Sequence, residues 1–258
     1  MALIYDVALN SQTRVLSLLD KAGNVISSCE VPSKNTELTL KATADNSSVK
    51  LTKYGTLSNT FEVNTGNGWQ SYTLYKVINL NAGQSCKWRC SAHPTTQTRR
   101  NYIQFEMTGK IEASGDVNSM LSSDFEGITV LPAYAFGGLF IDCTSLTRAP
   151  ELPLTTLGVH CYEYMFKGCT SLVQAPNLPA TTLAEGCYKQ MFARCTRLVE
   201  VHIAATTTAT DALNDWLASG AKTGDFYCDP SATIFPTNSA SGIPTGWTRL
   251  PLSDYPTT

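Results

Sequence analysis

Charged residues are scarce in this chain of 258 residues. They make up 16% of the sequence, against about 25% in an average soluble protein, and the formal net charge is only −2. No block of Lys and Arg occurs. The sequence therefore predicts neither the phosphate-binding surface of a nucleic-acid-binding protein nor the basic patch of a membrane-surface protein. No apolar run approaches the ~18 residues that cross a bilayer, so we expect no membrane insertion.

Histidine, the usual imidazole base, occurs only three times, at His93, His160 and His202. None of the three belongs to a nucleophile motif such as G-x-S-x-G, and the carboxylates are scattered. Asp211 and Asp215 lie four residues apart on an expected helix, where capping and solvation explain them better than catalysis does. We therefore predict no catalytic residues, no cofactor and no enzymatic activity. A carbohydrate-active enzyme with a carboxylate pair is the alternative class.

An internal repeat with a period of 26 residues runs through the second half of the chain. The best-matched stretches, 143–157 and 169–183, share Cys-Thr-Ser-Leu, Ala-Pro, Leu-Pro and Thr-Thr-Leu at equivalent places. A repeat of this size cannot bury its own apolar face, so we expect neighbouring units to stack into a solenoid with one continuous core. Four sets of residues recur at this spacing: Phe140, Phe166 and Phe192; Cys143, Cys169 and Cys195; Leu146, Leu172 and Leu198; and Leu131, Leu157 and Leu183.

Each unit is predicted to contain a short strand, a proline-bounded turn and a short helix. Apolar residues recur at steps of three to five between Leu183 and Cys195, which predicts one face of a helix. Pro176 and Pro179 exclude that helix from the preceding segment and leave a short extended piece at 172–175.

Two stretches of the repeat carry a family resemblance. Residues 164–172 read Tyr-Met-Phe-Lys-Gly-Cys-Thr-Ser-Leu, and residues 178–188 read Leu-Pro-Ala-Thr-Thr-Leu-Ala-Glu-Gly-Cys-Tyr. They resemble the BspA-like class of leucine-rich repeats, as does the closing segment 241–247, and the resemblance covers residues 117–250. That class abounds in gut anaerobic bacteria, their mobile elements and their phages. The resemblance implies a recognition or adhesion role and supplies no catalytic residues.

The cysteines are predicted to be buried free thiols. Five of the nine form two ladders of the repeat, Cys143/Cys169/Cys195 and Cys161/Cys187, whose parallel stacking does not suit disulfides. The motif Cys86-x-x-x-Cys90-x-x-His93 has metal-ligand residue types. Cys86 and Cys90 alternate with charged residues on an expected strand, however, which favours a core position over a metal site. We predict no metal site.

The first 110 residues are predicted to be all-β. Residues 36–110 predict an antiparallel β-sandwich, because seven apolar-alternating segments are separated by turn signals every eight to twelve residues. Residues 1–35 predict a separate arm, in which 14–19 and 25–29 form a hairpin and 31–35 a linker. Because a lone hairpin is only marginally stable in water, the arm either anchors and oligomerises the protein or packs onto residues 36–110.

Residues 201–258 predict a C-terminal cap, since the repeat breaks after Leu198 and the end of a solenoid needs cover. The aromatic side chains of this region provide the apolar bulk, and sugar binding by exposed aromatic rings is the alternative. These side chains are Trp216, Phe226, Phe235 and Trp247.

The predicted fold is a mixed β and α/β-solenoid. The arm (1–35) precedes an N-terminal antiparallel β-sandwich domain (36–110), a short leucine-rich-repeat solenoid of 26-residue units (111–200) and the cap (201–258). We expect a non-catalytic recognition protein that binds a host-surface protein or glycan. Its binding residues are expected at positions that change from unit to unit while the core stays constant: Thr147, Arg148, Val173, Gln174, Arg197, Val199 and Glu200.

The setting is predicted from the start of the chain. The first twenty residues lack the basic-then-apolar pattern of a signal peptide, so the sequence as given predicts no export signal. A phage structural protein needs none. With an arm suited to attachment, this favours a fibre or decoration subunit on the virion surface, a homo-oligomer attached to a larger particle. The alternative is a bacterial cell-surface adhesin whose leader has been removed.

Overall fold

The computed structural model describes residues 6–10, 15–19, 25–30, 36–92 and 97–254. The chain divides into two compact units, Met1–Thr36 and Glu37–Thr258. The regular structure is almost entirely β and lies in several sheets, and the described residues include three short 3-10 helices but no α-helix. No helix in this part of the chain has the length and hydropathy to cross a membrane.

The first unit contains one antiparallel sheet of three strands in the order β1-β2-β3. These strands are β1 (Asp6–Asn10), β2 (Val15–Leu19) and β3 (Val25–Glu30). β2 and β3 pair antiparallel, which confirms the predicted hairpin, and β1 adds a third strand that the pattern did not predict. The predicted turn at 20–24 and linker at 31–35 lie outside the described residues.

The second unit begins with two sheets whose buried side chains meet. One is a three-stranded sheet in the order β10-β5-β8, and the other runs β12-β11-β4-β9-β6-β7. Trp88 from one sheet and Phe105 from the other contact edge to face, with ring centroids 5.1 Å apart. The strands here are β4 (Leu38–Ala42), β5 (Ser47–Tyr54), β6 (Thr60–Asn64), β7 (Gln70–Tyr72), β8 (Ile78–Leu80), β9 (Ser85–Ala92), β10 (Tyr102–Thr108) and β11 (Ile111–Ser114).

The six-stranded sheet continues without a break into the repeats. β11 pairs antiparallel with β4 and parallel with β12 (Leu146–Arg148), which belongs to the first well-matched repeat. The predicted boundary at 110/111 therefore lies inside a sheet. Two 3-10 helices, η1 (Val117–Met120) and η2 (Phe125–Gly127), follow β11.

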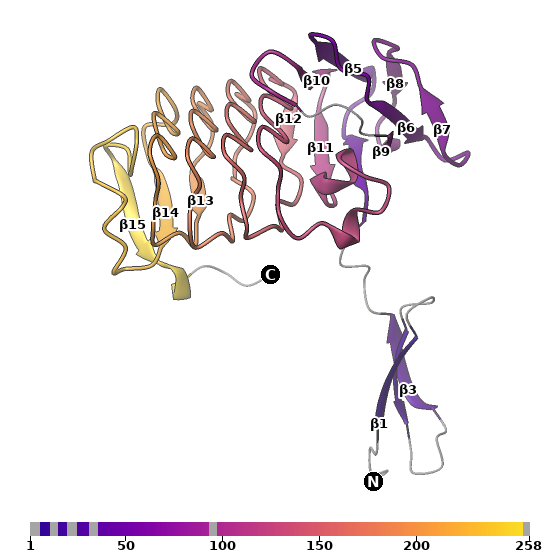
Figure 1. Ribbon diagram of the computed structural model, residues 1–258, viewed down its shortest axis with the longest axis horizontal. Coiled ribbons are helices and arrows are strands. Elements are labelled where there is room, and N and C mark those ends of the chain that lie inside the picture. The colour runs from indigo at the N-terminus through magenta and orange to yellow at the C-terminus, as the bar shows by residue number, and fades with distance from the viewer. Residues whose placement is uncertain (1–5, 11–14, 20–24, 31–35, 93–96, 255–258) are drawn as a thin grey trace. The chain divides into compact units, whose positions relative to one another are not determined.

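The repeats form successive coils that stack side by side, here called the coil stack (residues 111–251) (Figure 1). Backbone N–H groups of one coil donate to carbonyls of the next, about one repeat further along the chain. Such bonds run from Phe136 to Cys161 (2.8 Å), from Tyr162 to Cys187 (3.0 Å) and from Tyr188 to Ala212 (3.0 Å). β12 and the late strands β13 (Glu200–His202), β14 (Gly224–Cys228) and β15 (Trp247–Pro251) form one side, the strand side, before the 3-10 helix η3 (Leu252–Asp254).

The opposite side of the coil stack, the turn side, consists of tight turns at 132–143, 158–169, 184–195 and 209–220. The sequence predicted helices over 183–195 and 211–217, and the described backbone of these segments shows that this prediction is wrong. Every fourth residue has a positive φ, as at His160 (54°), Tyr164 (60°) and Gly168 (77°). An α-helix cannot continue through such residues.

Alternate amides of the turn side explain why apolar residues recur at helix-like steps without a helix. The amide of Glu163 donates to the His160 carbonyl three residues earlier (3.2 Å), whereas the amide of Tyr164 donates to Lys189 in the next coil (2.9 Å). Half of the donors thus bind the neighbouring coil instead of the carbonyl four residues back. The predicted inward-facing residues are nevertheless correct, since Cys187, Met191 and Cys195 are fully buried.

Two ladders of stacked aromatic rings pass through the core of the coil stack. Phe105, Phe140, Phe166 and Phe192 stack at centroid distances of 5.4, 5.5 and 5.6 Å. Phe136, Tyr162 and Tyr188 stack beside them at 5.9 Å per step. Both ladders end on Trp216. The predicted phenylalanine positions are therefore confirmed as core.

The cysteine ladder is buried and free of disulfides, as predicted. The thiols of Cys169 and Cys195 donate to backbone carbonyls of the preceding coil (3.1 and 3.0 Å), and that of Cys143 donates to the Phe105 carbonyl of β10 (3.0 Å). Burial raises the pKa of Cys195 to about 12, so the thiol is protonated and retains its donor hydrogen. A weak donor that also packs as a small apolar group suits this position.

Beyond the last matched repeat, an aromatic cluster covers the core. The ring of Trp216 meets those of Phe226 (5.9 Å) and Phe235 (6.4 Å), and all three side chains are buried. Sugar binding by these three rings is therefore wrong. Trp247 is half-buried, and its indole N–H donates to the Ala221 carbonyl at 3.0 Å.

Candidate functional site

The predicted binding residues come together along the strand side of the coil stack. Val173 and Val199 occupy equivalent places in adjacent coils, joined by the bond from the Val199 amide to the Val173 carbonyl (2.9 Å). Gln174 and Glu200 form a parallel bridge, and the Gln174 amide donates to the Glu200 carboxylate. Thr147 and Arg148 lie on β12, one repeat earlier. We call Arg148, Gln174, Glu200 and their neighbours Thr147, Val173 and Val199 the strand-side row.

The strand-side row is open to solvent and mixed in character. Val173 and Val199 are 41% and 42% exposed. Arg148 is exposed and lies opposite Glu112 in the register of β11 and β12. Glu200 lies opposite Asp225 in the register of β13 and β14. Arg197 is exposed but precedes β13 by three residues. Along the row the charge changes from positive at Arg148 through neutral at Gln174 to negative at Glu200.

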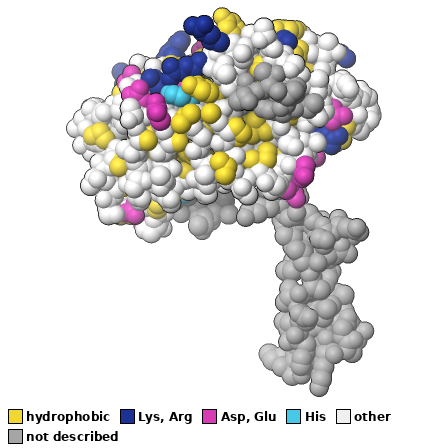
Figure 2. Space-filling model, viewed as in Figure 1, with side chains coloured by type: hydrophobic (Ala, Val, Ile, Leu, Met, Phe, Trp, Pro, Cys, Tyr) yellow, Lys and Arg dark blue, Asp and Glu magenta, His cyan; other side chains and the backbone are white. Residues whose placement is uncertain are grey.

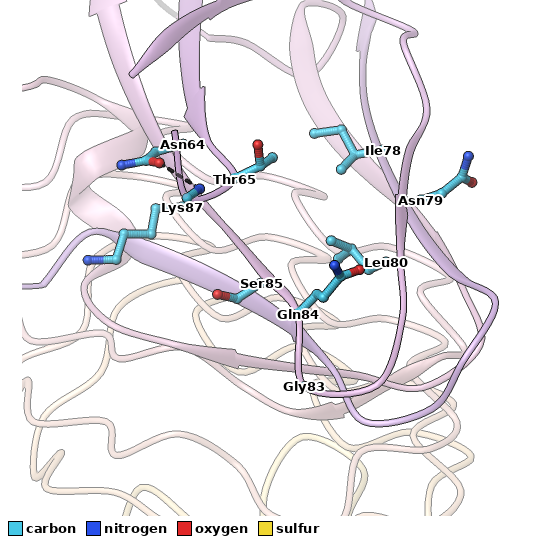
Figure 3. A pocket seen from close by; sticks show the side chains of 10 residues that line it. Asn64, Thr65, Ile78, Asn79, Leu80, Gly83, Gln84, Ser85 and Lys87 are labelled. Carbon is cyan, nitrogen blue, oxygen red and sulfur yellow. Dashed lines mark hydrogen bonds between the residues drawn. The ribbon is translucent and has the colours of Figure 1, made fainter. Parts of the chain in front are cut away.

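A first pocket, of about 580 Å³, lies among the β-strands that precede the coils. In Figure 3, the turn at Asn64 and the strand at Asn79 lie on opposite sides of it. Two of its polar side chains accept hydrogen bonds from backbone amides within turns. The Asn64 side-chain oxygen accepts from the Gly66 amide (2.8 Å), and the Gln84 side-chain oxygen accepts from the Asn81 amide (2.8 Å). These two side-chain oxygens are therefore engaged in stabilising turns.

A second site lies on the turn side, around the buried carboxylate of Glu163. This residue is only 3% exposed, and its Oε2 lies 3.2 Å from both the Arg99 Nε and the His160 Nδ1. Arg99 Nη2 also lies 3.2 Å from His160 Nε2. A buried carboxylate needs such partners, and its charge in turn raises the pKa of Arg99. The Arg99 side chain itself is 55% exposed and faces solvent.

A pocket of about 380 Å³ adjoins Glu163, here called the tyrosine pocket. Three aromatic rings line it, and each is held on one side by a neighbour. Tyr134 stacks on His160 (centroids 5.0 Å apart), Tyr102 stacks on Tyr54 (5.3 Å), and the Lys167 ammonium lies 4.9 Å from the Tyr164 ring. The described residues that line the tyrosine pocket are Thr98, Arg99, Tyr102, Tyr134, Gly137, Gly138, Ile141, Glu163 and Tyr164.

The repeat explains how these side chains meet. Tyr134, His160 and Gly186 occupy one equivalent position in three coils, with φ of 56°, 54° and 59°. A Cβ at position 186 would lie 2.1 Å from His160 Nδ1, so glycine leaves room for the imidazole. A side chain other than glycine costs about 1–2 kcal/mol in this backbone region. The turn side thus carries Tyr134 and His160 at places where glycine fits most easily.

On the face shown in Figure 2, hydrophobic side chains spread across the middle of the second unit, while Lys and Arg side chains gather along one edge. The sequence pattern singled out His160 only as one of three possible imidazole bases, and it did not point to Arg99, Glu163 or the tyrosines. The available signal was Glu163, an acid between two tyrosines where the equivalent residues are Gly137 and Lys189.

The expected core positions of the cysteine motif in β9 are confirmed. Cys86 and Trp88 are fully buried and Cys90 is 1% exposed, and burial raises the pKa of Cys86 to about 12. The third member of the motif, His93, lies outside the described residues. Within the residues that the structure describes, no group of three or more His, Cys, Asp or Glu side chains is placed to hold a metal ion.

Comparison of the chain with protein-family models, with curated proteins and with solved structures finds no match. Two surfaces of the described residues are therefore candidate sites. One is the strand-side row, flat and exposed. The other is the tyrosine pocket, concave and lined by aromatic and charged groups.

Proposed function

We propose that this protein is a non-catalytic recognition protein whose repeats form a leucine-rich-repeat solenoid of the BspA-like kind. The supporting observation is the contrast between constant and changing positions in the same coils. The core repeats Phe140, Phe166 and Phe192. The strand-side row changes from Arg148 through Gln174 to Glu200 at one equivalent, solvent-facing place.

A row of this kind suits a macromolecular partner. Exposed valines beside polar and charged side chains offer apolar contact area surrounded by polar groups, as protein-binding surfaces do. Backbone bonds between coils fix the spacing of the side chains before a partner arrives, which lowers the entropy cost of binding. The proposed partner is a host-surface protein or glycan. A carbohydrate-active enzyme is less supported, because Glu163 is held by Arg99 and His160 rather than paired with a second carboxylate.

The proposed setting is the virion surface, with the protein as a fibre or decoration subunit. The first unit, a compact sheet of three strands at one end of the chain, suits attachment to a larger particle and self-association. A bacterial cell-surface adhesin is the alternative setting. Light scattering of the full chain and of a chain lacking residues 1–35 tests this role: we expect a multimer that becomes a monomer on truncation. A monomer in both cases would remove the assembly role.

Binding of the full chain to immobilised mucin and to gut bacterial cells tests the recognition function. A variant carrying Arg148→Ala, Gln174→Ala and Glu200→Ala is expected to bind at least about tenfold more weakly, since each contact of this kind contributes about 1 kcal/mol. The matched control replaces exposed threonines elsewhere on the same coils, Thr155→Ala and Thr181→Ala. Equal binding by the row variant would contradict the assigned surface, and no binding by the unmodified chain would contradict the function.

A further inference from the structure

The tyrosine pocket has preformed aromatic walls. Tyr134 is backed by His160 and Tyr102 by Tyr54, in nearly parallel stacks with interplanar angles of 17° and 19°. Rings fixed in this way lose little rotamer freedom when a ligand arrives. Tyrosine also offers both an apolar face and a polar hydroxyl. The walls therefore suit a ligand that has an apolar face and a polar rim.

The charges of the tyrosine pocket balance locally. The Arg99 guanidinium carries one positive charge and lies 3.2 Å from the carboxylate of Glu163, which carries one negative charge. A guanidinium has five N–H donors; the ion pair with Glu163 uses the Nε–H, and Nη2 lies 3.2 Å from His160 Nε2. The remaining donors of the half-exposed side chain can bond to ligand oxygens. Because Arg99 and Glu163 neutralise each other, and the Lys167 ammonium beside Tyr164 already donates to the Gln190 side-chain oxygen (2.7 Å), the lining favours a neutral ligand over a charged one.

The dimensions favour one small group rather than a long segment. A volume of about 380 Å³ lies at the lower end of the about 300–1,000 Å³ of ligand pockets. Glycine at positions 137 and 138 keeps one wall free of side chains. The lining comes from two parts of the chain, since Arg99 and Glu163 are 64 residues apart. The pocket is thus part of the tertiary structure rather than a feature of a single turn.

We propose that the tyrosine pocket binds one neutral sugar ring at the end of a glycan. The tyrosine faces stack on the apolar face of the ring, and Arg99 and the tyrosine hydroxyls bond to its hydroxyl groups. This inference rests on the proposed recognition function and deepens it, because it names the ligand class and a site separate from the strand-side row. Residues 98–102 and 134–164 then carry a glycan site on the turn side, while the strand-side row on the opposite side contacts a separate surface.

The test uses the full chain against a glycan array and against free neutral hexoses, N-acetylhexosamines and acidic sugars, with saturation-transfer NMR as the readout. The first variant, Arg99→Ala, removes the donor. The second, Gly137→Leu, fills the pocket at a glycine whose added Cβ would have no atom closer than 3.7 Å, so the fold tolerates a side chain there. The control is Tyr75→Ala, which removes a 54% exposed tyrosine from outside the pocket.

We expect a neutral sugar to bind, both pocket variants to weaken it at least about tenfold, and Tyr75→Ala to leave it unchanged. Thermal unfolding of each variant shows whether it is folded, and Gly137→Leu retains every charged and aromatic group. Tighter binding of an acidic sugar than of any neutral one would overturn the ligand class. Mucin or cell binding that is lost in the strand-side row variant but kept in both pocket variants would overturn the pocket while the proposed function stands. No binding of any kind would overturn both.

Discussion

The two sides of the coil stack use the same repeat in different ways. On the strand side, extended residues bridge in parallel, and equivalent side chains such as Val173 and Val199 form a flat, exposed row. On the turn side, positive φ values at every fourth residue turn the chain repeatedly, and unequal residues at equivalent places leave a pocket. A constant core can therefore support a flat surface and a concave site at once, each changed without the other.

The largest expected effect comes from the core that both sides share. Phe166→Ala removes a fully buried ring that stacks on Phe140 and Phe192, and it should lower the free energy of unfolding by about 3–5 kcal/mol. Chemical denaturation measures this change. The control, Tyr54→Ala, removes a ring that is 62% exposed and should cost less than about 1 kcal/mol. Equal losses would mean that the aromatic ladder does not hold the two sides together.

The turn side depends on the fit between one glycine and one histidine. Gly186→Ala places a Cβ 2.1 Å from His160 Nδ1 at a φ of 59°, so we expect a loss of about 2 kcal/mol or more in unfolding free energy. The double variant Gly186→Ala/His160→Ala should regain the part of this loss that comes from the contact with the imidazole. The remaining loss, about 1 kcal/mol, is the cost of a Cβ at a positive φ. Gly137→Ala is the control, with contacts of 3.7 Å or longer and little expected change. A double variant no better than Gly186→Ala would refute this fit.

At the start of the coil stack, the buried carboxyl group of Asp116 is expected to make the free energy of unfolding depend on pH. Burial raises the pKa of Asp116 from 3.8 to about 6, although its Oδ1 accepts from the Asn118 amide at 2.8 Å. The folded state thus binds more protons than the unfolded state between these two values, and stability falls as pH rises from about 4 to 6. The cost at pH 7 is at most about 3 kcal/mol.

Asp116→Asn keeps the acceptor and removes the charge, so this variant should be more stable than the unmodified chain at pH 7 and lose part of the slope between pH 4 and 6. Unfolding free energies across this pH range measure the effect. Asp124→Asn, at an exposed residue before η2, serves as the control. A slope that survives Asp116→Asn unchanged would assign it to other groups.

The smallest effect on stability is expected on the strand side. Glu200→Gln alters an exposed pair with Gln174 and should change the unfolding free energy by less than about 0.5 kcal/mol. The midpoint of thermal unfolding should therefore stay within about 2 °C. A large loss would show that the strand-side row is structural, which would weaken the case for a binding surface.

The parts of the fold that follow simple periodicities could be predicted from the sequence. Alternation placed the strands between Leu38 and Thr108, and the repeat placed Phe166 and Cys169 in the core beside their equivalents. The helices were wrong because consecutive turns bring apolar residues inward at the same steps of three to five as a helix does. Amides shared between coils, such as that of Tyr164, decide the difference, and a single unit does not contain that information.

Of the two sites, the strand-side row could be predicted from the repeat, whereas the tyrosine pocket could not. The spacing of 26 residues brings Val173 beside Val199, so the repeat alone predicted that the strand-side row would be contiguous; its role in binding stays a prediction. The tyrosine pocket joins Arg99, which precedes the repeats, to Glu163 within them. No local pattern relates residues so far apart, and only the fold brings them together.

Hydrogen–deuterium exchange of the full chain, free and bound to the mucin or cell-surface fraction that it captures, tests the central claim most directly. The account predicts slower exchange in the bound state at 147–148, 173–174 and 197–200, with the turns at 184–195 and 209–220 unchanged. Protection confined to those turns or to residues 1–35, with none along the strand-side row, would contradict it.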